Sequence, residues 1–278
     1  MRWTIWFAIP IAVFAGGTLL AQQPDRIDMG YFANGEVGQY RVLTSLIIQN
    51  QESEEARIQV RFRRADGEPM DGLTLRTRAR NSNQHQTGAG GEIEELRIPP
   101  EAFRNFESTG EGPLQLGSCS LQSNSAIRVH SRVRLVDADG NLVTEVNIHP
   151  SGRFRTGGFH LDRRDPKDVG LSLTNTSAGV DAVCVLQLYE SVDGDGDDVP
   201  LLEGDGVTLT LGGDGQNTRM LKELFEDQYE QTLKAFLEDP LTGDVYATVT
   251  CDNPVHAVVL HLHGLTYLDI PVNPVDPD

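Results

Sequence analysis

Apolar and polar residues alternate along much of the chain. Between Arg57 and Arg63, for example, Ile58, Val60 and Phe62 are separated by single polar residues. A period of two places one set of side chains on each face of a β-strand. Similar runs recur at short intervals with Gly, Asp and Asn between them, and sustained helical periodicity is rare. The pattern therefore predicts an all-β protein.

The strand pattern occurs twice. Leu46–Asn50 followed by Ala56–Phe62 matches Leu171–Asn175 followed by Ala182–Leu188. In both copies an apolar run ends at Asn, a short polar turn follows, and a second strand begins. Later features also correspond: the Asp-Gly turns at 66–67 and 193–194, the short strands Ile93–Ile98 and Val207–Leu211, and expected closing hairpins at 119–135 and 246–262.

About seven strands per copy is the number typical of an immunoglobulin-like sandwich. We therefore predict two tandem immunoglobulin-like β-sandwiches, one at 24–150 and one at 151–274. Pro, Ser and Gly interrupt the strand pattern near His149–Gly152, which favours a boundary there. An apolar face in Thr218–Glu238 predicts a short helical insert in the second domain, and Pro99–Phe106 is expected to form one helical turn in the first.

Four segments carry a resemblance to a known module: Tyr31–Gly35, Thr44–Asn50, Val60–Met70 and Tyr267–Val272. Together they resemble the tandem immunoglobulin-like β-sandwich module of exported bacterial proteins. The resemblance implies the fold and carries no assigned activity or site residues. The chain departs from that pattern in an acidic segment at 193–198 and in the helical insert.

The beginning of the chain has the features of a secretion signal. Arg2 precedes an apolar run from Trp3 to Leu20, and Ala21 offers a small residue for cleavage before Gln22. We expect residues 1–21 to be a signal peptide, the alternative being an uncleaved anchor. After cleavage no membrane span is expected, so the protein is predicted to be secreted or periplasmic.

Charge excludes one class of partner. The net charge is −18, and most of it lies after Ser151. A strongly acidic second half argues against nucleic-acid binding.

The three cysteines allow at most one bridge within the chain. Cys184 lies near the start of its strand, and Cys251 lies at the end of the penultimate strand of the same copy. If these strands are antiparallel neighbours, a Cys184–Cys251 disulfide can form; the alternative is two separate buried thiols. Cys119 would then be a small core residue.

The acidic segment is the sharpest local feature. Oxygen ligands for Ca²⁺ could come from Asp193, Asp195, Asp197, Asp198 and Glu203. The spacing differs from an EF-hand, and Asp-Gly repeats are also typical of a solvated turn. Apart from this possible Ca²⁺, no cofactor is expected. His261 and His263 share a strand face, where we interpret them as exposed residues, with Leu260 and Leu262 pointing into the core.

Arginines gather in the first domain. They follow one face of each of two strands: Arg57, Arg61 and Arg63, and Arg128, Arg132 and Arg134. We expect the two strands to flank a common neighbour, so that the arginines cover one sheet. Guanidinium groups suit carboxylate, phosphate or sulfate. The face is predicted to bind an acidic polymer or to dock onto the acidic second domain, unless ordinary pairing with carboxylates such as Glu92 accounts for it.

No motif for a catalytic nucleophile, a zinc protease, a phosphate loop or a dinucleotide site is present in the sequence. The leading hypothesis is therefore an exported, non-enzymatic binding or structural module of the cell envelope or extracellular space. Its partner would be an acidic polysaccharide or an envelope protein. The alternatives are a carbohydrate-binding module, and a hydrolase that uses acidic residues.

Overall fold

The computed structural model describes residues 25–77, 84–88, 90–148, 152–161, 169–191, 198–202, 204, 206–225, 244–263 and 266–275. Over these residues the protein is all-β with antiparallel pairing, and one short helix spans residues 221–225. The expected signal peptide (1–21), the domain boundary near 150 and the acidic residues 193, 195, 197 and 203 lie outside the described residues.

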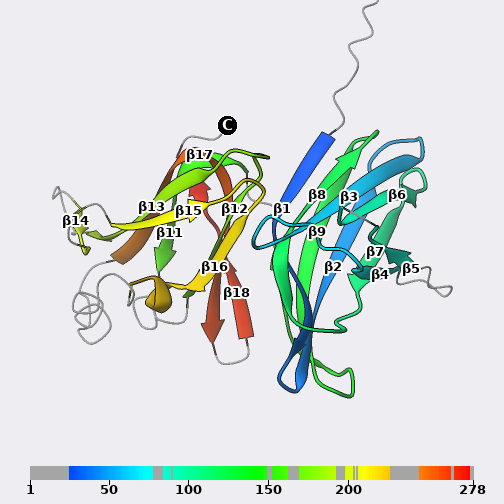
Figure 1. Cartoon of the computed structure of the whole chain (residues 1–278), viewed down its shortest axis with the longest axis horizontal. Helices are drawn as coiled ribbons and strands as arrows, with labels where there is room; N and C mark the ends of the chain where they lie inside the picture. Colours follow the sequence, from blue (N-terminus) through cyan, green and yellow to red (C-terminus); the bar gives the residue numbers. More distant parts are fainter. Residues whose placement is uncertain are drawn as a thin grey trace, which may run out of the picture.

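The strands form two units that lie side by side (Figure 1). The first unit contains β1 (Asp25–Val37), β2 (Tyr40–Asn50), β3 (Ala56–Arg64), β4 (Thr74–Thr77), β5 (Gln84–Gln86), β6 (Glu92–Ile98), β7 (Phe103–Ser108), β8 (Gln115–Ser123), β9 (Ile127–Val136) and β10 (Leu142–Ile148). We call β6-β3-β8-β1 sheet A and β5-β4-β7-β2-β9-β10 sheet B. Residues 25–34 of β1 pair with β8 and residues 35–37 pair with β2, so β1 joins the two sheets.

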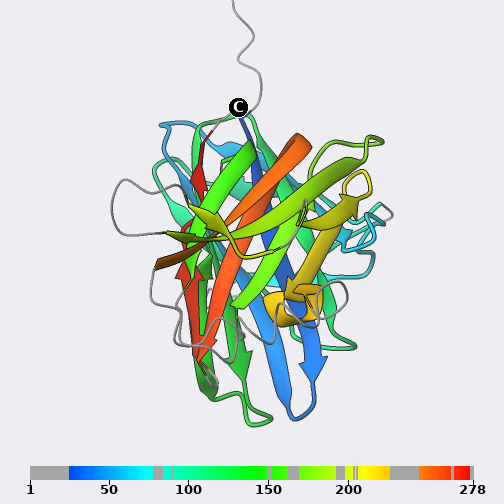
Figure 2. The same cartoon turned by 90° about the vertical axis from the view of Figure 1, so that its left-hand side faces the viewer.

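The second unit is organised around one long strand. It contains β11 (Phe154–Leu161), β12 (Val169–Asn175), β13 (Ala182–Ser191), β14 (Val199–Pro200), β15 (Val207–Leu211), β16 (Gln216–Met220), β17 (Asp244–His263), β18 (Thr266–Ile270) and β19 (Asn273–Pro274). The first half of β17 pairs with β13 and β11, and its second half pairs with β12 and β18. In Figure 2, where the second unit faces the viewer, β17 crosses this unit in orange.

Strand pairing repeats from one unit to the other. β2 pairs with β7 and β9, as β12 pairs with β16 and the second half of β17. β3 pairs with β6 and β8, as β13 pairs with β15 and the first half of β17. Because β8 and β9 together correspond to β17, the repeat detected in the sequence is also a repeat of topology.

Each unit has its own hydrophobic core. Side chains such as Phe32, Phe62 and Leu46 fill the first, and Phe154, Phe159 and Leu186 fill the second. These strands follow the alternation read from the sequence: β3 runs buried, exposed, buried from Ala56 onward, as expected for a sheet with one face in a core. Burial of these apolar faces is the main stabilising contribution in both units.

Two predictions about local structure were wrong. The expected closing hairpins do not form, because β8 and β9 lie in different sheets and β17 is one continuous strand. Residues 103–106 belong to β7, paired with β2, and not to a helical turn. The predicted helical insert is confirmed in part: residues 221–225 form a short helix, whereas residues 218–220 belong to β16, held by β12, and residues 226–238 lie outside the described residues.

The repeated asparagines have the same role in both copies. The amide of Asn50 donates to the carbonyls of Glu54 (2.6 Å), Ile98 (3.3 Å) and Pro99 (3.1 Å), and its Oδ1 accepts from the Glu52 N–H. Each Asn ties the turn after its own strand to the end of a strand far along the chain.

In the second unit the Asn175 amide donates to Val180 (2.7 Å), Leu211 (3.4 Å) and Gly212 (3.1 Å), and its Oδ1 accepts from Ser177. Both asparagines are fully buried. The final Asn of the sequence repeat is therefore a structural position, since a buried amide satisfies backbone groups that water cannot reach.

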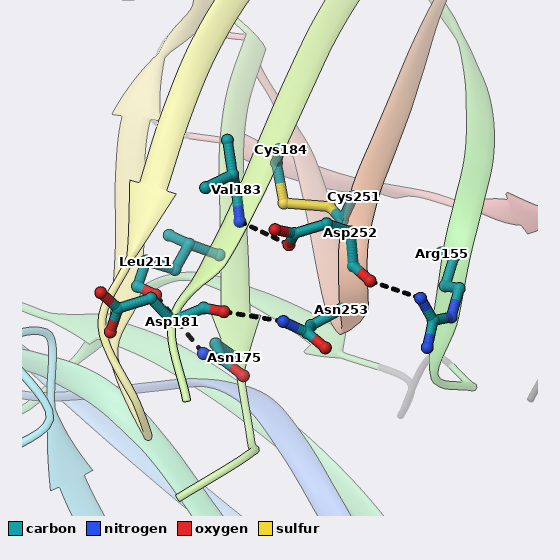
Figure 3. Close-up of a disulfide and its surroundings, with 9 residues drawn as sticks. All are labelled: Arg155, Asn175, Asp181, Val183, Cys184, Leu211, Cys251, Asp252 and Asn253. Carbon is teal, nitrogen blue, oxygen red and sulfur yellow. Dashed lines mark hydrogen bonds between the residues drawn. A yellow bond between two sulfur atoms is a disulfide. The ribbon is translucent and has the colours of Figure 1, made fainter. Parts of the chain in front are cut away.

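The predicted Cys184–Cys251 disulfide is confirmed. The two cysteines are directly opposed on β13 and β17, with their Cα atoms 4.0 Å apart. Figure 3 shows the polar contacts beside it: Asp252 Oδ1 accepts from the Val183 N–H (2.8 Å), and Asn253 donates to the Asp181 carbonyl (2.8 Å). The bridge links the start of β13 to the part of β17 where its pairing changes from β13 to β12.

Candidate binding site at the junction of the two units

The outer face of sheet A and the edge of β10 pack against β12, β17 and β18 of the second unit (Figure 1). An apolar cluster of Val146, Ile148 and Val258 lies at this junction, with Tyr31 and Leu260 against it. Elsewhere along the junction the Gln216 N–H donates to the Ala65 carbonyl across the units (2.8 Å). The junction therefore combines apolar packing with backbone hydrogen bonding.

The Gly30 carbonyl on β1 is the main polar acceptor of the junction. It accepts from Thr174 Oγ1 (2.8 Å) and Gln216 Nε2 (3.0 Å), with Ser172 Oγ at 3.4 Å. A Cβ atom at Gly30 would lie only 3.2 Å from the Cβ of His256. Glycine is needed here because the second unit approaches the β1 backbone directly.

A carboxylate–imidazole pair also crosses the junction. Asp28 Oδ2 lies 3.7 Å from His256 Nε2, and both side chains are less than one-tenth exposed. Asp28 Oδ1 accepts from Arg26 Nε (2.9 Å). Burial opposes ionisation of Asp28, but its interactions with His256 and Arg26 outweigh that effect and hold the pKa of the Asp28 carboxyl below its usual 3.8.

Beside this pair lies a polar pocket of about 50 Å³ between the units. It is lined by three arginines of the first unit, Arg26, Arg61 and Arg63, and by Thr176 and Asp214 of the second. Arg63 Nε and Thr176 Oγ1 are buried and have no hydrogen-bond partner among the described residues. Buried donors of this kind are normally satisfied by water or by a ligand.

The remaining contacts of these arginines leave donors available. Arg63 Nη1 donates to the Gly90 carbonyl (3.0 Å), and its Nε lies 4.0 Å from Asp214 Oδ2. Arg61 Nε pairs with Glu92 (2.6 Å). Asp28 also lines the pocket, and each of its three arginines already faces a carboxylate. The guanidinium N–H groups outside these contacts are the groups that suit a small anion such as a carboxylate or sulfate.

The two arginine rows do not share a sheet, contrary to the expectation from sequence. Arg57, Arg61 and Arg63 lie on β3 in sheet A, beside Ser118 and Ser120 of β8. The other row lies on β9, which pairs with β2 and β10 in sheet B. A common neighbour for the two rows required β8 and β9 to form a hairpin within one sheet. Instead, the chain crosses from sheet A to sheet B after β8.

The row in sheet B is largely held by carboxylates. Arg134 Nη1 donates to Glu107 (2.8 Å), and Arg132 Nη1 lies 3.5 Å from Glu145. Arg128 is exposed and forms no ion pair with a described residue. Arg57, in the sheet A row, lies 3.9 Å from Glu55 at the solvent. Only Arg61 and Arg63 of the predicted arginines line the pocket at the junction.

Of the residues predicted to bind Ca²⁺, only Asp198 lies in the described part of the chain. It accepts a hydrogen bond from the Tyr246 hydroxyl. No cluster of three or more metal-ligating side chains is found among the described residues. The Ca²⁺ hypothesis stays a prediction.

The expectation for His261 was wrong. Its side chain is buried, because residues 255, 257, 259 and 261 of β17 face the core of the second unit. Leu260, expected in the core, points to the junction. In this part of β17 both faces carry apolar residues, so the sequence could not show which face lies in the core. Cys119 is a buried free thiol, and burial raises its pKa well above the ordinary range.

Sequence reasoning missed an aromatic pair on the second unit. Tyr189 and Tyr246 are directly opposed on β13 and β17, and their rings stack with centroids 5.3 Å apart. The exposed His160 ring lies 6.3 Å from Tyr246. Burial and the hydrogen bond to Asp198 raise the pKa of Tyr246 to about 12. The sequence contains one Tyr in each of the two strands, but only the register between the strands shows that the two side chains are opposed.

Comparison with protein-family models, curated proteins and solved structures found no match to this chain. Among the described residues, no helix has the length and apolar character needed to cross a membrane.

Proposed function

We propose that the protein is an exported, non-enzymatic binding module that holds an acidic polymer at the junction between its two units. The units would be immunoglobulin-like β-sandwiches in tandem, the strand pairing of one repeating that of the other. The apolar run at the start of the sequence and the Cys184–Cys251 disulfide support an oxidising location, periplasmic or extracellular.

The observation that carries this proposal is the buried Arg63 Nε in a pocket with Arg26 and Arg61: it lies 4.0 Å from Asp214 Oδ2 and has no hydrogen-bond partner among the described residues. An anionic group in the pocket would give this donor its missing acceptor. Outside the pocket, Arg57 continues the same row along β3, so a chain with regularly spaced carboxylates or sulfates can follow the strand. A polymer contacts several sites at once, which raises its affinity above that of a single group.

Retention on a resin of an acidic polysaccharide, such as heparin or polygalacturonate, tests the proposal. The double variant Arg61→Gln/Arg63→Gln is expected to elute at clearly lower salt than the wild type, because two charge-assisted contacts are lost.

The matched control lies in the other sheet. The variant Arg128→Gln/Arg132→Gln removes the same charge from the β9 row, away from the pocket, and is expected to elute close to the wild type. Equal losses from both variants would mean that net charge alone governs retention, and unchanged elution of the Arg61/Arg63 variant would contradict the site.

A specific observation favours a second candidate, carbohydrate binding on the second unit. The stacked Tyr189–Tyr246 pair, with exposed His160 beside it, offers aromatic surface on which a sugar ring can pack. Loss of glycan binding in Tyr189→Ala, but not in Arg61→Gln/Arg63→Gln, would place the site there. The opposite result would favour the junction.

A further inference from the structure

Two cavities lie at the junction, and Tyr31 and Leu260 line both. The first has a volume of about 340 Å³ and lies between β1, β2, β8, β9 and β10. The second, of about 250 Å³, lies against β12, β16 and β17 of the other unit. Since they share two lining residues, the two cavities are adjacent.

The first cavity is built almost entirely from hydrocarbon. Its walls include Val42, Leu116, Val133 and Leu135, and none of its lining residues carries a charge. At its mouth, Val37 and Leu114 are each 41% exposed. An apolar cavity surrounded by exposed apolar side chains is typical of a ligand site, and such sites are common between domains.

The second cavity changes character toward its far end. Close to Tyr31 it is bounded by Val258 and Leu260, and farther along by Thr218, Arg219 and Glu223. The end near Tyr31 is therefore apolar, like the first cavity, whereas the other end offers hydroxyl, guanidinium and carboxylate groups.

We propose that the two adjacent cavities together bind a single-chain amphiphile of the fatty-acid type. Its aliphatic tail lies in the first cavity and its carboxylate head lies near Arg219. An aliphatic tail fits because the walls consist of Val, Leu and Ala with the faces of Tyr31 and Tyr40, and present no fixed charge. The site is distinct from the arginine pocket, so either can exist without the other.

Binding is tested by displacing the neutral fluorescent probe N-phenyl-1-naphthylamine with dodecanoate, below the concentration at which it forms micelles. Dodecanoate is expected to displace the probe. Across shorter homologues, affinity is expected to rise about fourfold per added methylene until the cavity is filled, because each methylene leaves water. Dodecanol is expected to bind more weakly than dodecanoate, and Arg219→Gln to remove that difference.

Two variants test the location. Leu114→Glu places a carboxylate at the mouth and is expected to weaken dodecanoate about tenfold or more, because the tail would have to desolvate that charge. Val42→Phe fills the cavity from within and is expected to weaken it similarly. Leu142→Glu is the matched control, since Leu142 is similarly exposed (49%) but does not line the cavity.

Failure of dodecanoate to displace the probe, affinity independent of chain length, or equal weakening in Leu114→Glu and Leu142→Glu would overturn the proposal. Displacement that survives in Arg61→Gln/Arg63→Gln is expected, and it separates this site from the proposed polymer site.

Discussion

At the scale of single residues, each of the two asparagines that end the repeated strands binds several backbone groups with one side chain. Removing the Asn50 amide takes the donor from the buried Ile98 carbonyl and also breaks the bonds to Glu54 and Pro99, although Pro99 keeps the Ala102 N–H as a donor. Asn50→Ala is expected to lower the free energy of unfolding of the first unit by about 3 kcal/mol, because each buried group left unpaired costs about 1–3 kcal/mol. Urea denaturation measures the difference.

Asn124→Ala is the control for this prediction. Asn124 also accepts a backbone hydrogen bond, from the Arg57 N–H (2.7 Å), but at an exposed position. Water can replace that bond, so a loss of about 1 kcal/mol or less is expected. Equal losses at both positions would contradict the role assigned to buried Asn50.

The Asp28 carboxylate gives the junction a defined response to acid. Its pKa in the folded protein is held below its ordinary value of 3.8, so its stabilising contribution is complete above about pH 4 and is lost as the pH falls through the lowered pKa. The wild type is therefore expected to lose more stability than Asp28→Asn between about pH 6 and about pH 3. Thermal denaturation across this pH range measures the difference in stability. Asp139→Asn, which changes an exposed residue in a turn, is the control and is expected to behave as the wild type does. Parallel pH profiles for wild type and Asp28→Asn would show that the pair contributes nothing.

At the scale of elements, the disulfide is where the two copies differ most plainly. The first unit has Ile58 opposite Ser123 at the position where the second has Cys184 opposite Cys251. The bridge closes a loop with a sequence separation of 67 residues. Cys184→Ala/Cys251→Ala is expected to lower the free energy of unfolding by about 4 kcal/mol in the chain-entropy model. Cys119→Ala should cost much less, about 1 kcal/mol.

Counting thiols in the unfolded protein provides an independent measurement. One thiol is expected without reductant, from Cys119, and three after reduction. Three thiols before reduction would show that the bridge does not form in solution.

Elements also show where sequence reasoning succeeded and where it stopped. The all-β fold, the repeat and the disulfide could be predicted, because alternation and turn residues are local signals and Cys184 and Cys251 were expected on neighbouring antiparallel strands, where they lie. The hairpins were misread because Tyr246–Thr250 and Val255–Leu262 look the same whether they fold back on each other or run on as β17. Only partner strands distinguish the two, and pairing is not local.

At the scale of the whole molecule, the arginine pocket and the two cavities lie where the two units meet, and no single segment encodes them. Arg61 and Arg63 could be singled out from the alternation in β3. Their pocket also needs Arg26, Thr176 and Asp214, which are brought together only by docking. His261 was misplaced for the same reason: alternate residues of β17 are apolar on both faces, because one face fills a core and the other meets the first unit.

A small side chain at Gly30 tests how tightly the two units pack at the junction. A Cβ at Gly30 would meet His256 at 3.2 Å and Thr174 Oγ1 at 3.7 Å, so Gly30→Val must push the second unit away from β1. We expect a cost of about 1–3 kcal/mol from overpacking and a larger radius of gyration in small-angle scattering. Both cores stay intact, so circular dichroism should keep its β signature. Gly152→Val is the control, because a Cβ there meets no atom within 4 Å. If Gly30→Val scatters as the wild type does, the two units are not held in this arrangement in solution, and the arginine pocket and the two adjacent cavities lose the surface that forms them.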